Sequence, residues 1–396
     1  MPEAILALNA GSSSLKFGLY KRPNDSEDPT VLVTGSVRDL HGTSPRFQVT
    51  APDNTVLVEE HWTKSAPDGA IEGLLDWVQG HLRKTRLVAV GHRVVHGGPE
   101  FSDPVEIDEP ILARLEALTP LAPLHQPASL APVRRIRASR LDLRQFACFD
   151  TAFHRQIGPP ASRYALPRAF EAEGIRRYGF HGLSYESIAA QLKASGDQAV
   201  AGPASRIIVA HLGNGASLCA LQGLKSVDTT MGFSTLDGLV MGTRPGVLDP
   251  GILLYLLQER GLTVERLEQL LYRESGLLGV SGISADVATL LASDASAAAE
   301  ALDLFAFQVA RQTAALTATL GGIDRFIFTG GIGEHAPAVR RMIAVRLGWL
   351  GAEIDEQANA SGATVISTRT SSILLERRST QEEFMIARHV LKLLHK

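Results

Sequence analysis

The first chemically distinctive stretch of the sequence is a small polar turn between two short apolar runs. Residues 5–20 read ILALNAGSSSLKFGLY, and the turn carries a glycine and three serines, with a lysine just after it. Gly11 lets the backbone approach a ligand closely, the serine hydroxyls donate hydrogen bonds, and Lys16 adds a positive charge or orients the hairpin. These groups suit a bound phosphate. The alternative is an ordinary serine-rich hairpin, since Gly and Ser are common turn residues.

A second stretch repeats this pattern half a chain later. Residues 207–222 read IIVAHLGNGASLCALQ, where an apolar run meets the turn Gly213–Asn214–Gly215 before a second apolar run. Asn-Gly between apolar runs predicts a β-hairpin. In both stretches a strand follows the turn, whereas the common phosphate loop GxxxxGK[ST] leads into a helix. The repetition predicts a duplicated core domain, with a polyphosphate held in a cleft between the copies.

Three further segments carry groups that could do chemistry. FACFDTAFH (146–154) is predicted to be a strand ending in Asp150, where a carboxylate could bind magnesium, act as an acid or base, or cap a turn. The segment 225–251 is long and rich in turns, as functional loops often are, and its cation Arg244 is flanked by glycines. FIFTGGIGEHAPAVRR (326–341) reads as strand, glycine turn and helix, which alone is weak evidence for nucleotide binding.

The composition bounds the class of protein. The chain has 396 residues, enough for two domains, with 45% hydrophobic and 20% charged residues. A formal net charge of −3 argues against a nucleic-acid coat or a polybasic membrane surface. Cys148 and Cys219 lie in apolar runs without metal-binding spacing, so we expect buried thiols in a reducing compartment. Because neither a signal peptide nor an apolar run of ~18 residues is apparent, we expect a cytoplasmic protein.

Hydrophobic periodicity predicts the elements that position these groups. Alternation predicts antiparallel strands at 31–37 and within 47–62. Helical periodicity or helix caps predict helices at 70–82, 132–141, 250 to about 261, 263–274 and 293–320. The arginines of 132–141 are expected on a solvated face. An amphipathic helix is expected within 375–396, with a capping box made by Thr380 and Glu383.

In this order, the motifs resemble those of the acetate kinase family, a member of the superfamily of actin, sugar kinases and heat-shock chaperone ATPases. The resemblance covers nearly the whole chain. The segments that carry it are LNAGSSSLKF, GHRVVHGG, LAPLHQP, FDTAFH, RRYGFHG, HLGNGASLCA, DTTMGF, MGTRPG, FTGGIGE and TQEEFMIA. It implies an α/β fold of two duplicated βββαβαβα domains, ribonuclease H-like and actin-like, flanking a nucleotide cleft. The first domain would span 1–150 with the helix 384–396, and the second would span 151–383.

The activity implied by the resemblance is reversible in-line transfer of the γ-phosphoryl of ATP to acetate, giving acetyl phosphate and ADP. By position, Arg93 and Arg244 would hold the carboxylate and the transferring phosphoryl. His181 would contact the phosphoryl, His125 would support the same site, and Asp150 would be a further catalytic group. The acetate methyl group would lie in a small pocket formed by Val95, Leu124, Phe180 and Thr235.

The resemblance also implies binding residues for ATP and its metal. ATP would be bound by residues of the two hairpins and the third glycine turn: Asn9, Lys16, His211, Leu212, Gly213, Asn214, Gly215, Gly330, Gly331, Ile332, Gly333 and Glu334. Mg²⁺, with Mn²⁺ as an alternative, would be bound by Asn9 and Glu382. Asp150 is a further candidate for the metal, and Glu383 competes with its neighbour. The family implies a homodimer, with no nucleic-acid or membrane partner.

The residue types agree with this chemistry. A carboxylate acceptor is already ionised near neutral pH, so the reaction needs no general base. The difficulty is instead to bring two anions together in line. Arginine suits this task because its planar guanidinium pairs with carboxylate and phosphate while staying charged. Magnesium and backbone donors would then stabilise the charge on the equatorial oxygens.

Some alternatives stay open at this level. Family members usually carry proline at the position of Thr235, and a buried hydroxyl needs a partner, so the acceptor is left open between acetate and propionate. A nucleotide-binding regulator of the superfamily would lack the paired arginines and the histidines, and a phosphohydrolase would release phosphate without an acceptor. His92 and His96 are expected to be structural, and Asp249 and Asp286 to be helix caps.

Overall fold

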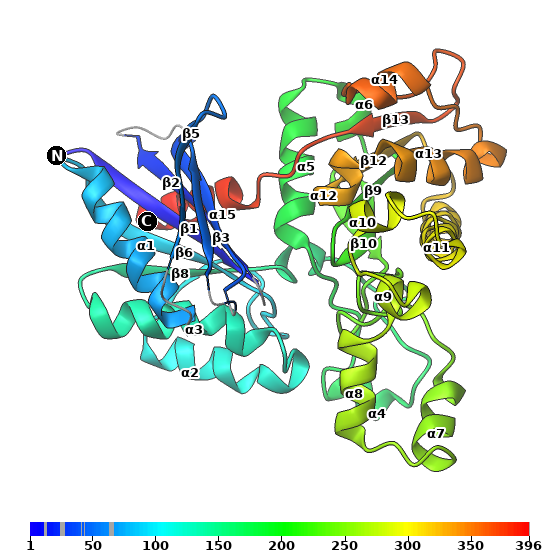
Figure 1. Cartoon of the computed structure of the whole chain (residues 1–396), viewed down its shortest axis with the longest axis horizontal. Helices are drawn as coiled ribbons and strands as arrows, with labels where there is room; N and C mark the ends of the chain where they lie inside the picture. The colour runs from blue at the N-terminus through cyan, green and yellow to red at the C-terminus, as the bar shows by residue number, and fades with distance from the viewer. Residues whose placement is uncertain (12–13, 24–27, 41, 43, 63–66, 396) are drawn as a thin grey trace. The chain divides into compact units, whose positions relative to one another are not determined.

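The computed structural model describes residues 1–11, 14–23, 28–40, 42, 44–62 and 67–395. The chain divides into two compact units, each built on one β-sheet with packed helices (Figure 1). Unit 1 comprises Met1–Ala152 and Gln381–Lys396, and unit 2 comprises Phe153–Thr380. The last segment of the chain therefore belongs to the same unit as the first.

The sheet of unit 1 contains both the N-terminal hairpin and the strands that follow it. Its strands are β1 (Glu3–Ala10), β2 (Ser14–Arg22), β3 (Thr30–Arg38), β4 (Arg46–Thr50), β5 (Val56–His61), β6 (Arg86–Val94), β7 (Val105–Glu106) and β8 (Arg144–Phe149). They lie in the order β5-β4-β3-β2-β1-β6-β8-β7, with β1 antiparallel to β2 and parallel to β6. The predicted hairpin is confirmed, with Asn9 opposite Lys16. Of its three serines, Ser12 and Ser13 lie outside the described residues.

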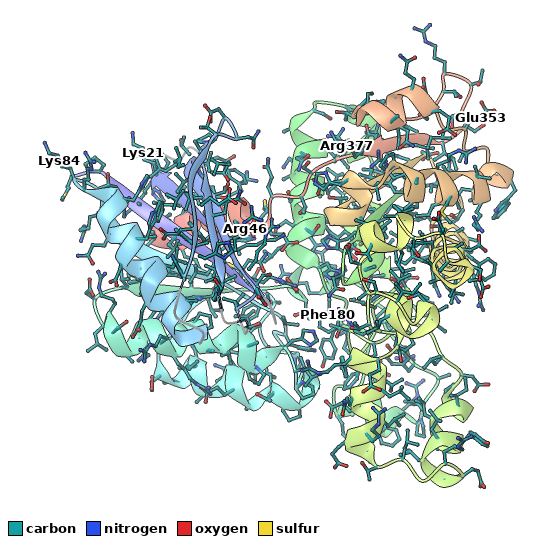
Figure 2. The ribbon with its side chains drawn as sticks, in the orientation of Figure 1. Lys21, Arg46, Lys84, Phe180, Glu353 and Arg377 are labelled. Atoms are coloured by element: carbon teal, nitrogen blue, oxygen red, sulfur yellow. The ribbon has the colours of Figure 1, made fainter. Side chains whose placement is uncertain are left out.

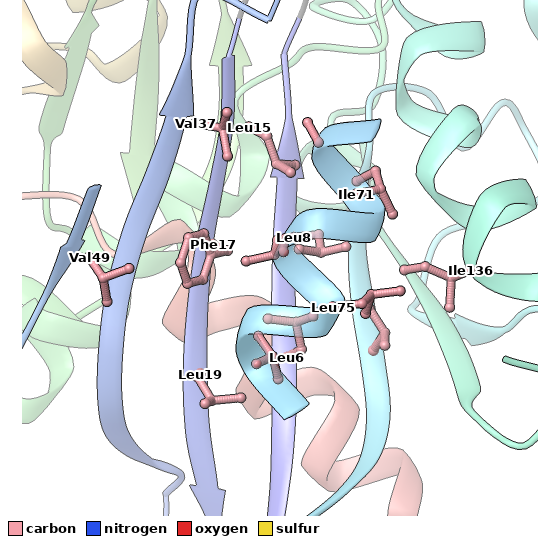
Figure 3. Close-up of a cluster of buried hydrophobic side chains, with 14 of the residues drawn as sticks. Leu6, Leu8, Leu15, Phe17, Leu19, Val37, Val49, Ile71, Leu75 and Ile136 are labelled. Atoms are coloured by element: carbon pink, nitrogen blue, oxygen red, sulfur yellow. The ribbon is translucent and has the colours of Figure 1, made fainter. Parts of the chain in front are cut away.

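The two faces of this sheet are covered by helices from opposite ends of the chain. The helices of unit 1 are α1 (Pro67–Leu82), α2 (Glu109–Ala117), α3 (Gln126–Ser139) and α15 (Glu382–Leu394). Leu6, Leu8 and Phe17 point from one face into a core shared with α1 (Figure 3). On the other face, α15 packs against β1, β2 and β6. A Cβ on Gly91 would lie 2.4 Å from Ile386 of α15, so this close approach requires glycine.

The sheet of unit 2 is smaller. Its strands are β9 (Ile207–Leu212), β10 (Ala216–Gln222), β11 (Lys225–Thr229), β12 (Arg325–Thr329) and β13 (Leu374–Arg377). Its helices are α4 (Arg168–Ala172), α5 (Gly182–Ala194), α6 (Gln198–Ala201), α7 (Pro250–Gln258), α8 (Val264–Arg273), α9 (Gly276–Ser281), α10 (Val287–Leu291), α11 (Ser296–Leu320), α12 (Gly330–His335), α13 (Pro337–Arg346) and α14 (Glu356–Ser361). The apolar residues of α5 join those of the strands in one buried core.

The two sheets share a topology. Unit 2 has the order β11-β10-β9-β12-β13, which matches β3-β2-β1-β6-β8 in unit 1. In each, the first three strands are antiparallel, and the last two are parallel to the first strand of the hairpin. This correspondence confirms the duplicated core that the two glycine hairpins predict.

The end of the chain differs from the sequence-based prediction. Residues 374–377 form β13, and the helix begins only at Glu382. The capping box is wrong, because the N-cap residue is Gln381 and it makes no side-chain capping bond. The backbone N–H of Thr380 instead donates to Glu334 Oε1 at 3.2 Å. A second difference is the short strand β11, which lies within the segment 225–251 that was predicted to be turn-rich.

Several structural predictions are confirmed. Asp249 accepts from the N–H of Gly251 and Asp286 from that of Thr289, each at the start of a helix. The arginines of the 132–141 run all form ion pairs with nearby carboxylates: Arg134 with Glu116, Arg135 with Glu72, Arg137 with Glu109 and Arg140 with Asp142. Both cysteines are buried thiols. Among the described residues, no helix combines the length and apolarity required to cross a membrane.

Candidate functional site

A charged cluster lies on the α15 side of the unit 1 sheet. Asn9 and Arg93 lie near the carboxyl ends of the parallel strands β1 and β6, and Asp150 directly follows β8. The first turn of α15 adds Glu382 and Glu383. These five residues, hereafter the unit 1 cluster, come from four separate segments. The sheet register and the packing of α15 bring them together.

Hydrogen bonds connect every member of the unit 1 cluster. Arg93 Nε donates to Asp150 Oδ1 at 2.9 Å and Oδ2 at 3.0 Å, and its Nη2 donates to Oδ2 at 2.5 Å. Arg93 Nη1 also donates to Asn9 Oδ1 at 3.0 Å. The amide of Asn9 in turn donates to Glu382 Oε2 at 2.8 Å and to Glu383 Oε1 at 3.0 Å. Asn9 therefore links the arginine to the carboxylate pair.

The unit 1 cluster contains more carboxyl groups than positively charged groups. Burial alone would lower the pKa of Arg93, but the nearby charge of Asp150 and of the two glutamates raises it. Burial and the adjacent Glu382 raise the pKa of Glu383, while Lys16 and the Asn9 hydrogen bond act in the opposite direction. A buried carboxylate whose ionisation is made costlier by a neighbouring carboxylate forms a site that a cation would stabilise.

The carboxylates of the unit 1 cluster are candidates for binding a metal ion. Within the described part of the chain, no group of three or more His, Cys, Asp or Glu side chains is arranged to hold a metal ion. Mg²⁺ in phosphoryl-transfer sites commonly uses only one or two carboxylates together with water and substrate phosphates. The carboxylate pair of Glu382 and Glu383 fits that smaller donor set. Both oxygens of Asp150 accept from Arg93, which favours a role in holding the arginine.

In unit 2, two histidines stack beside the second glycine hairpin. His181 and His211 have ring centroids 4.3 Å apart with planes inclined by 22°. His181 precedes α5 with φ of 57°, a left-handed conformation that is uncommon outside glycine. Its Nδ1 lies 2.8 Å from Ser217 Oγ, and His211 Nδ1 lies 2.8 Å from Ser184 Oγ. Strained backbone of this kind is frequent at functional sites.

Two side chains converge on Gly215 at the end of this hairpin turn. A Cβ built on Gly215 would lie 2.8 Å from Arg244 Nη2 and 3.2 Å from His181 Nε2. A guanidinium, an imidazole and an open backbone position therefore meet within a few ångströms. Arg244 Nη1 also donates to the backbone oxygen of Thr235 at 2.9 Å, which fixes its direction.

The long segment 225–251 is ordered by close backbone contacts. A Cβ on Gly242 would lie 2.0 Å from Asn214 Oδ1. The backbone N–H of Gly242 also donates to the backbone oxygen of Asn214 at 3.1 Å. Thr235 is buried, and the hydroxyl of Tyr272 hydrogen bonds with its side chain. The buried hydroxyl of Thr235 is therefore satisfied.

The third glycine turn lies at the neighbouring strand end. β12 is parallel to β9, so Thr329 pairs with His211 and the turn after β12 adjoins the second hairpin. Gly330 has φ of 77°, and its Cβ would lie 2.8 Å from the Leu212 oxygen. The Glu334 carboxylate accepts from the N–H of Gly330 at 3.2 Å, which closes the turn on itself.

A fully buried arginine supports this turn from behind. Arg340 Nη1 donates to the backbone oxygens of Gly333 and Glu334, each at 3.0 Å. Its Nε and Nη2 donate to the side chain and backbone of Asn359, each at 2.8 Å. Burial, with a smaller effect of Arg377, lowers the pKa of Arg340 to about 10. Its four partners are all neutral oxygens.

The remaining predicted site residues are divided between the units. His125 is the N-cap residue of α3, and it lies in unit 1 with the half-buried Leu124 and the buried Val95. Phe180 is buried at the start of α5 in unit 2 (Figure 2), where its backbone oxygen lies 2.9 Å from His154 Nε2. The structure thus assigns the predicted acyl-pocket residues to both units.

The histidines expected to be structural are deeply buried. His92 Nε2 lies 2.8 Å from Gln145 Oε1, and the N–H of Gly98 donates to His96 Nδ1 at 2.8 Å. Burial lowers the pKa of each histidine to about 4. Both therefore remain neutral near pH 7, as structural core histidines do.

Sequence reasoning missed the residues that orient the predicted ones. Tyr185, Ser217, Tyr272 and Arg340 contact predicted site residues or hold their loops. Ser217 lies within a recognised motif, which was a usable signal. The others are separated from their partners in sequence, and their contacts depend on sheet register and helix packing.

Comparisons with known proteins agree with this geometry. The profile of the Acetokinase family matches residues 4–388. Acetate kinase from Rhodopseudomonas palustris (strain TIE-1) is 47% identical over 396 residues, covering 99% of each chain. Acetate kinase from Rhizobium meliloti is 46% identical over 395 residues, covering 99% of this chain and 98% of the relative.

Solved structures extend the likeness to three dimensions. A propionate kinase from Francisella tularensis superposes with a TM-score of 0.87 at 37% identity, covering 98% of each chain. Acetate kinase from Porphyromonas gingivalis superposes with a TM-score of 0.83 at 34% identity, covering 99% of this chain and 100% of that one. The predicted fold, two duplicated actin-like ATPase cores, is therefore confirmed. The chain belongs to the acetokinase family.

Proposed function

We propose that the protein is an acetate kinase, which transfers the γ-phosphoryl group of ATP reversibly to the carboxylate of acetate. The products are acetyl phosphate and ADP. The observation that carries this proposal is the convergence of Arg244 and His181 on Gly215, in a chain that matches acetate kinases over its full length. A guanidinium and an imidazole beside an open backbone turn are groups that bind and stabilise a transferring phosphoryl.

The two arginines have separate tasks in this proposal. Arg244 binds the transferring phosphoryl, since its Nη2 lies at Gly215 while its Nη1 is held by the Thr235 oxygen. Arg93 binds the acetate carboxylate, and its own direction is fixed by Asp150 and Asn9. Neither residue has to move a proton, because acetate is ionised near pH 7. His181 and His125 act in this account as hydrogen-bond donors.

The nucleotide is bound by backbone-rich turns. We assign the phosphates to Asn9 and Lys16 of the first hairpin and to the turn of the second hairpin, formed by His211, Leu212, Gly213, Asn214 and Gly215. We assign the adenosine to the turn Gly330–Glu334, which Arg340 supports. Glycines at these positions expose backbone N–H groups that donate to phosphate oxygens.

Mg²⁺, for which Mn²⁺ could substitute, would be held by Glu382 with Asn9 beside it. When bound, the metal would neutralise charge on the phosphates. Glu383 also accepts from Asn9, so either glutamate fits the role. Comparing Glu382→Gln with Glu383→Gln by Mg²⁺ titration of turnover separates them. The metal-binding residue is the one whose substitution raises the Mg²⁺ concentration needed for half-maximal rate; equal shifts would mean that both serve.

Propionate is the second candidate acceptor, because one well-superposed structure is a propionate kinase and because Thr235 stands where the family usually has proline. The proposed pocket also includes Val95, Leu124 and Phe180. One methylene changes selectivity by only ~1–3 kcal/mol in such a pocket. We expect kcat/KM to fall from acetate to propionate to butyrate. A higher value for propionate or butyrate would assign that acid as the substrate.

A homodimer is the assembly we propose, and α7 supports it. The helix sequence is PGILLYLLQ, and Ile252, Leu254 and Tyr255 are each about half exposed, at 45%, 55% and 52%. An apolar face of this kind is typical of a protein interface. Light scattering after gel filtration should give a dimer for the wild type and a monomer for Leu254→Glu. A wild-type monomer would contradict the proposal. We propose cytoplasmic localisation, in keeping with the buried thiols.

The reaction itself is tested by trapping acetyl phosphate with hydroxylamine. The purified protein with ATP, Mg²⁺ and acetate should form acetyl hydroxamate, and omission of acetate should abolish the product. Release of orthophosphate without hydroxamate would identify a phosphohydrolase. ATP binding without either product would identify a nucleotide-binding regulator.

A further inference from the structure

A chain of buried hydrogen bonds leads from the backbone of β9 to the imidazole of His181. Tyr185, on the first turn of α5, is fully buried, and its hydroxyl lies 2.5 Å from Ser217 Oγ. Ser217, also fully buried on β10, lies 2.8 Å from His181 Nδ1. The Tyr185 hydroxyl in addition accepts from the backbone N–H of His211. These contacts join four residues: Tyr185, Ser217, His181 and His211.

The directions of these hydrogen bonds follow from the number of protons available. Each hydroxyl has one proton to donate. The Tyr185 oxygen accepts from His211, so its own proton is donated to the adjacent Ser217 Oγ. The reverse direction would strand the buried tyrosine proton, which costs about 1–3 kcal/mol. Burial also keeps Tyr185 protonated, because it raises the pKa of the phenol far above its ordinary value.

The count of protons also fixes the tautomer of His181. Ser217 Oγ accepts from Tyr185, so its proton is donated to His181 Nδ1. A neutral imidazole whose Nδ1 accepts a hydrogen bond carries its proton on Nε2. His181 Nε2 lies 3.2 Å from the Cβ position of Gly215, where Arg244 Nη2 also converges. The proton is therefore directed at the turn where we assign the phosphoryl group.

We propose that Tyr185 and Ser217 are positioning residues that hold His181 as the Nε2–H tautomer, so that it donates a hydrogen bond to the transferring phosphoryl group. The donor role rests on the proposed function, whereas the tautomer itself rests only on the hydrogen-bond geometry.

The tautomer is measured directly by ¹⁵N NMR of histidine-labelled protein, with His181→Gln used to assign the signal. The wild type should show His181 protonated on Nε2 when neutral. Ser217→Ala should shift the signal toward the Nδ1–H form, and Tyr185→Phe should shift it in the same direction by less. A wild-type His181 protonated on Nδ1 would overturn the proposal. This readout does not depend on the identity of the substrate.

Kinetics test the donor role with a double-mutant cycle. Ser217→Ala should lower kcat by about 10–100-fold, as loss of an outer orienting partner does elsewhere, with little change in the KM for ATP. In a His181→Gln background the same substitution should change kcat by less than about 2-fold, because there is no imidazole left to orient. Equal losses in both backgrounds would mean that Ser217 acts only on the fold, and would refute the proposal.

Matched controls are available in the same unit. Ser205 is buried and accepts from the N–H of Gly223 at 2.9 Å, and Tyr178 donates to the Gly174 oxygen at 2.8 Å. Ser205→Ala and Tyr178→Phe should leave both the His181 signal and kcat unchanged. If Ser217→Ala does not fold, Tyr185→Phe, which removes one oxygen from an intact ring, carries the same test. A wild type that forms no acetyl phosphate would refute the proposed function and leave the NMR test standing.

Discussion

Replacing Asp150 by Asn should weaken both unit 1 and catalysis, because Asp150 is the main partner of Arg93. The two residues are joined by three donor–acceptor contacts, and the Asp150 side chain is only 1% exposed. Asparagine keeps the shape but loses the charge, and its amide would face the guanidinium. Breaking a buried ion pair costs about 3–5 kcal/mol. Arg93 would keep its hydrogen bond with Asn9 and some contact with solvent, since its side chain is 19% exposed. We therefore expect Asp150→Asn to lower the free energy of unfolding of unit 1 by about 2–3 kcal/mol.

Unfolding of unit 1 can be followed separately by tryptophan fluorescence. Trp62 and Trp77 lie in unit 1, where both pack against Phe47, whereas Trp349 lies in unit 2. In a Trp349→Phe background the fluorescence transition reports unit 1 alone. Asp142→Asn is the matched control, because Asp142 pairs with Arg140 but is 66% exposed. An exposed pair contributes about 0–1 kcal/mol.

The expected result is a clear difference between the two substitutions. Asp150→Asn should lower the midpoint of thermal unfolding, followed by tryptophan fluorescence, by several degrees, and it should reduce kcat. Asp142→Asn should change neither quantity appreciably. In the double variant Arg93→Ala/Asp150→Asn, the destabilisation should be smaller than the sum of the single effects, because each partner is costly only when left alone. If Asp150→Asn is no more destabilising than Asp142→Asn, the reasoning about the buried pair is wrong.

Four further outcomes are expected. Burial lowers the pKa of His154 to about 4, below its ordinary 6.5, so the unfolded state binds a proton first; its contribution to stability should be full above pH 6.5 and fall by up to about 3 kcal/mol as the pH drops toward 4, with His92 and His96 adding losses in the same range, and a calorimetric melting series with a flat profile would contradict this. Gly91→Ala should cost about 1–3 kcal/mol of stability by displacing α15, whereas Gly80→Ala, with open space around its Cβ, should stabilise slightly; chemical denaturation compares them. Arg244→Ala should lower kcat by about 10²-fold or more with little change in ATP affinity by calorimetry, and unchanged turnover would remove Arg244 from the site. Tyr272→Phe should raise the KM for acetate by up to about 5-fold without raising that for ATP, since it unpairs the Thr235 hydroxyl; equal changes in both would contradict a local role.

The sequence predicted the two hairpins and their duplication because a hairpin depends on residues that are neighbours in sequence. The apolar runs on either side of the Asn9–Ser14 turn required a hairpin, and the repeat at residues 207–222 required a second one. Both are present, and the strand orders of the two sheets match. Helix starts at Asp249 and Asp286 were predictable for the same reason, since capping is a contact between neighbours in sequence.

Predictions failed where tertiary packing outweighs the local pattern. Residues 374–377 precede the amphipathic helix and were not predicted to be a strand, but parallel pairing with β12 makes them β13. The capping box failed because Thr380 N–H pairs with Glu334, 46 residues away. Tyr185 and Ser217 are 32 residues apart, and only the packing of α5 against β9, which pairs with β10, brings them together. Residues that bind substrate carry distinctive types, whereas residues that orient them look like ordinary core.

The most direct test of the account is ³¹P NMR of the protein with ATP, Mg²⁺ and acetate. The γ-phosphate signal of ATP should decline while a signal of acetyl phosphate rises in equal amount, and ADP should accumulate in step. Addition of acetyl phosphate and ADP should run the same conversion backward. Conversion of the γ-phosphate directly to orthophosphate, or no change with acetate present, would contradict the assignment of this chain as a kinase that phosphorylates a carboxylate.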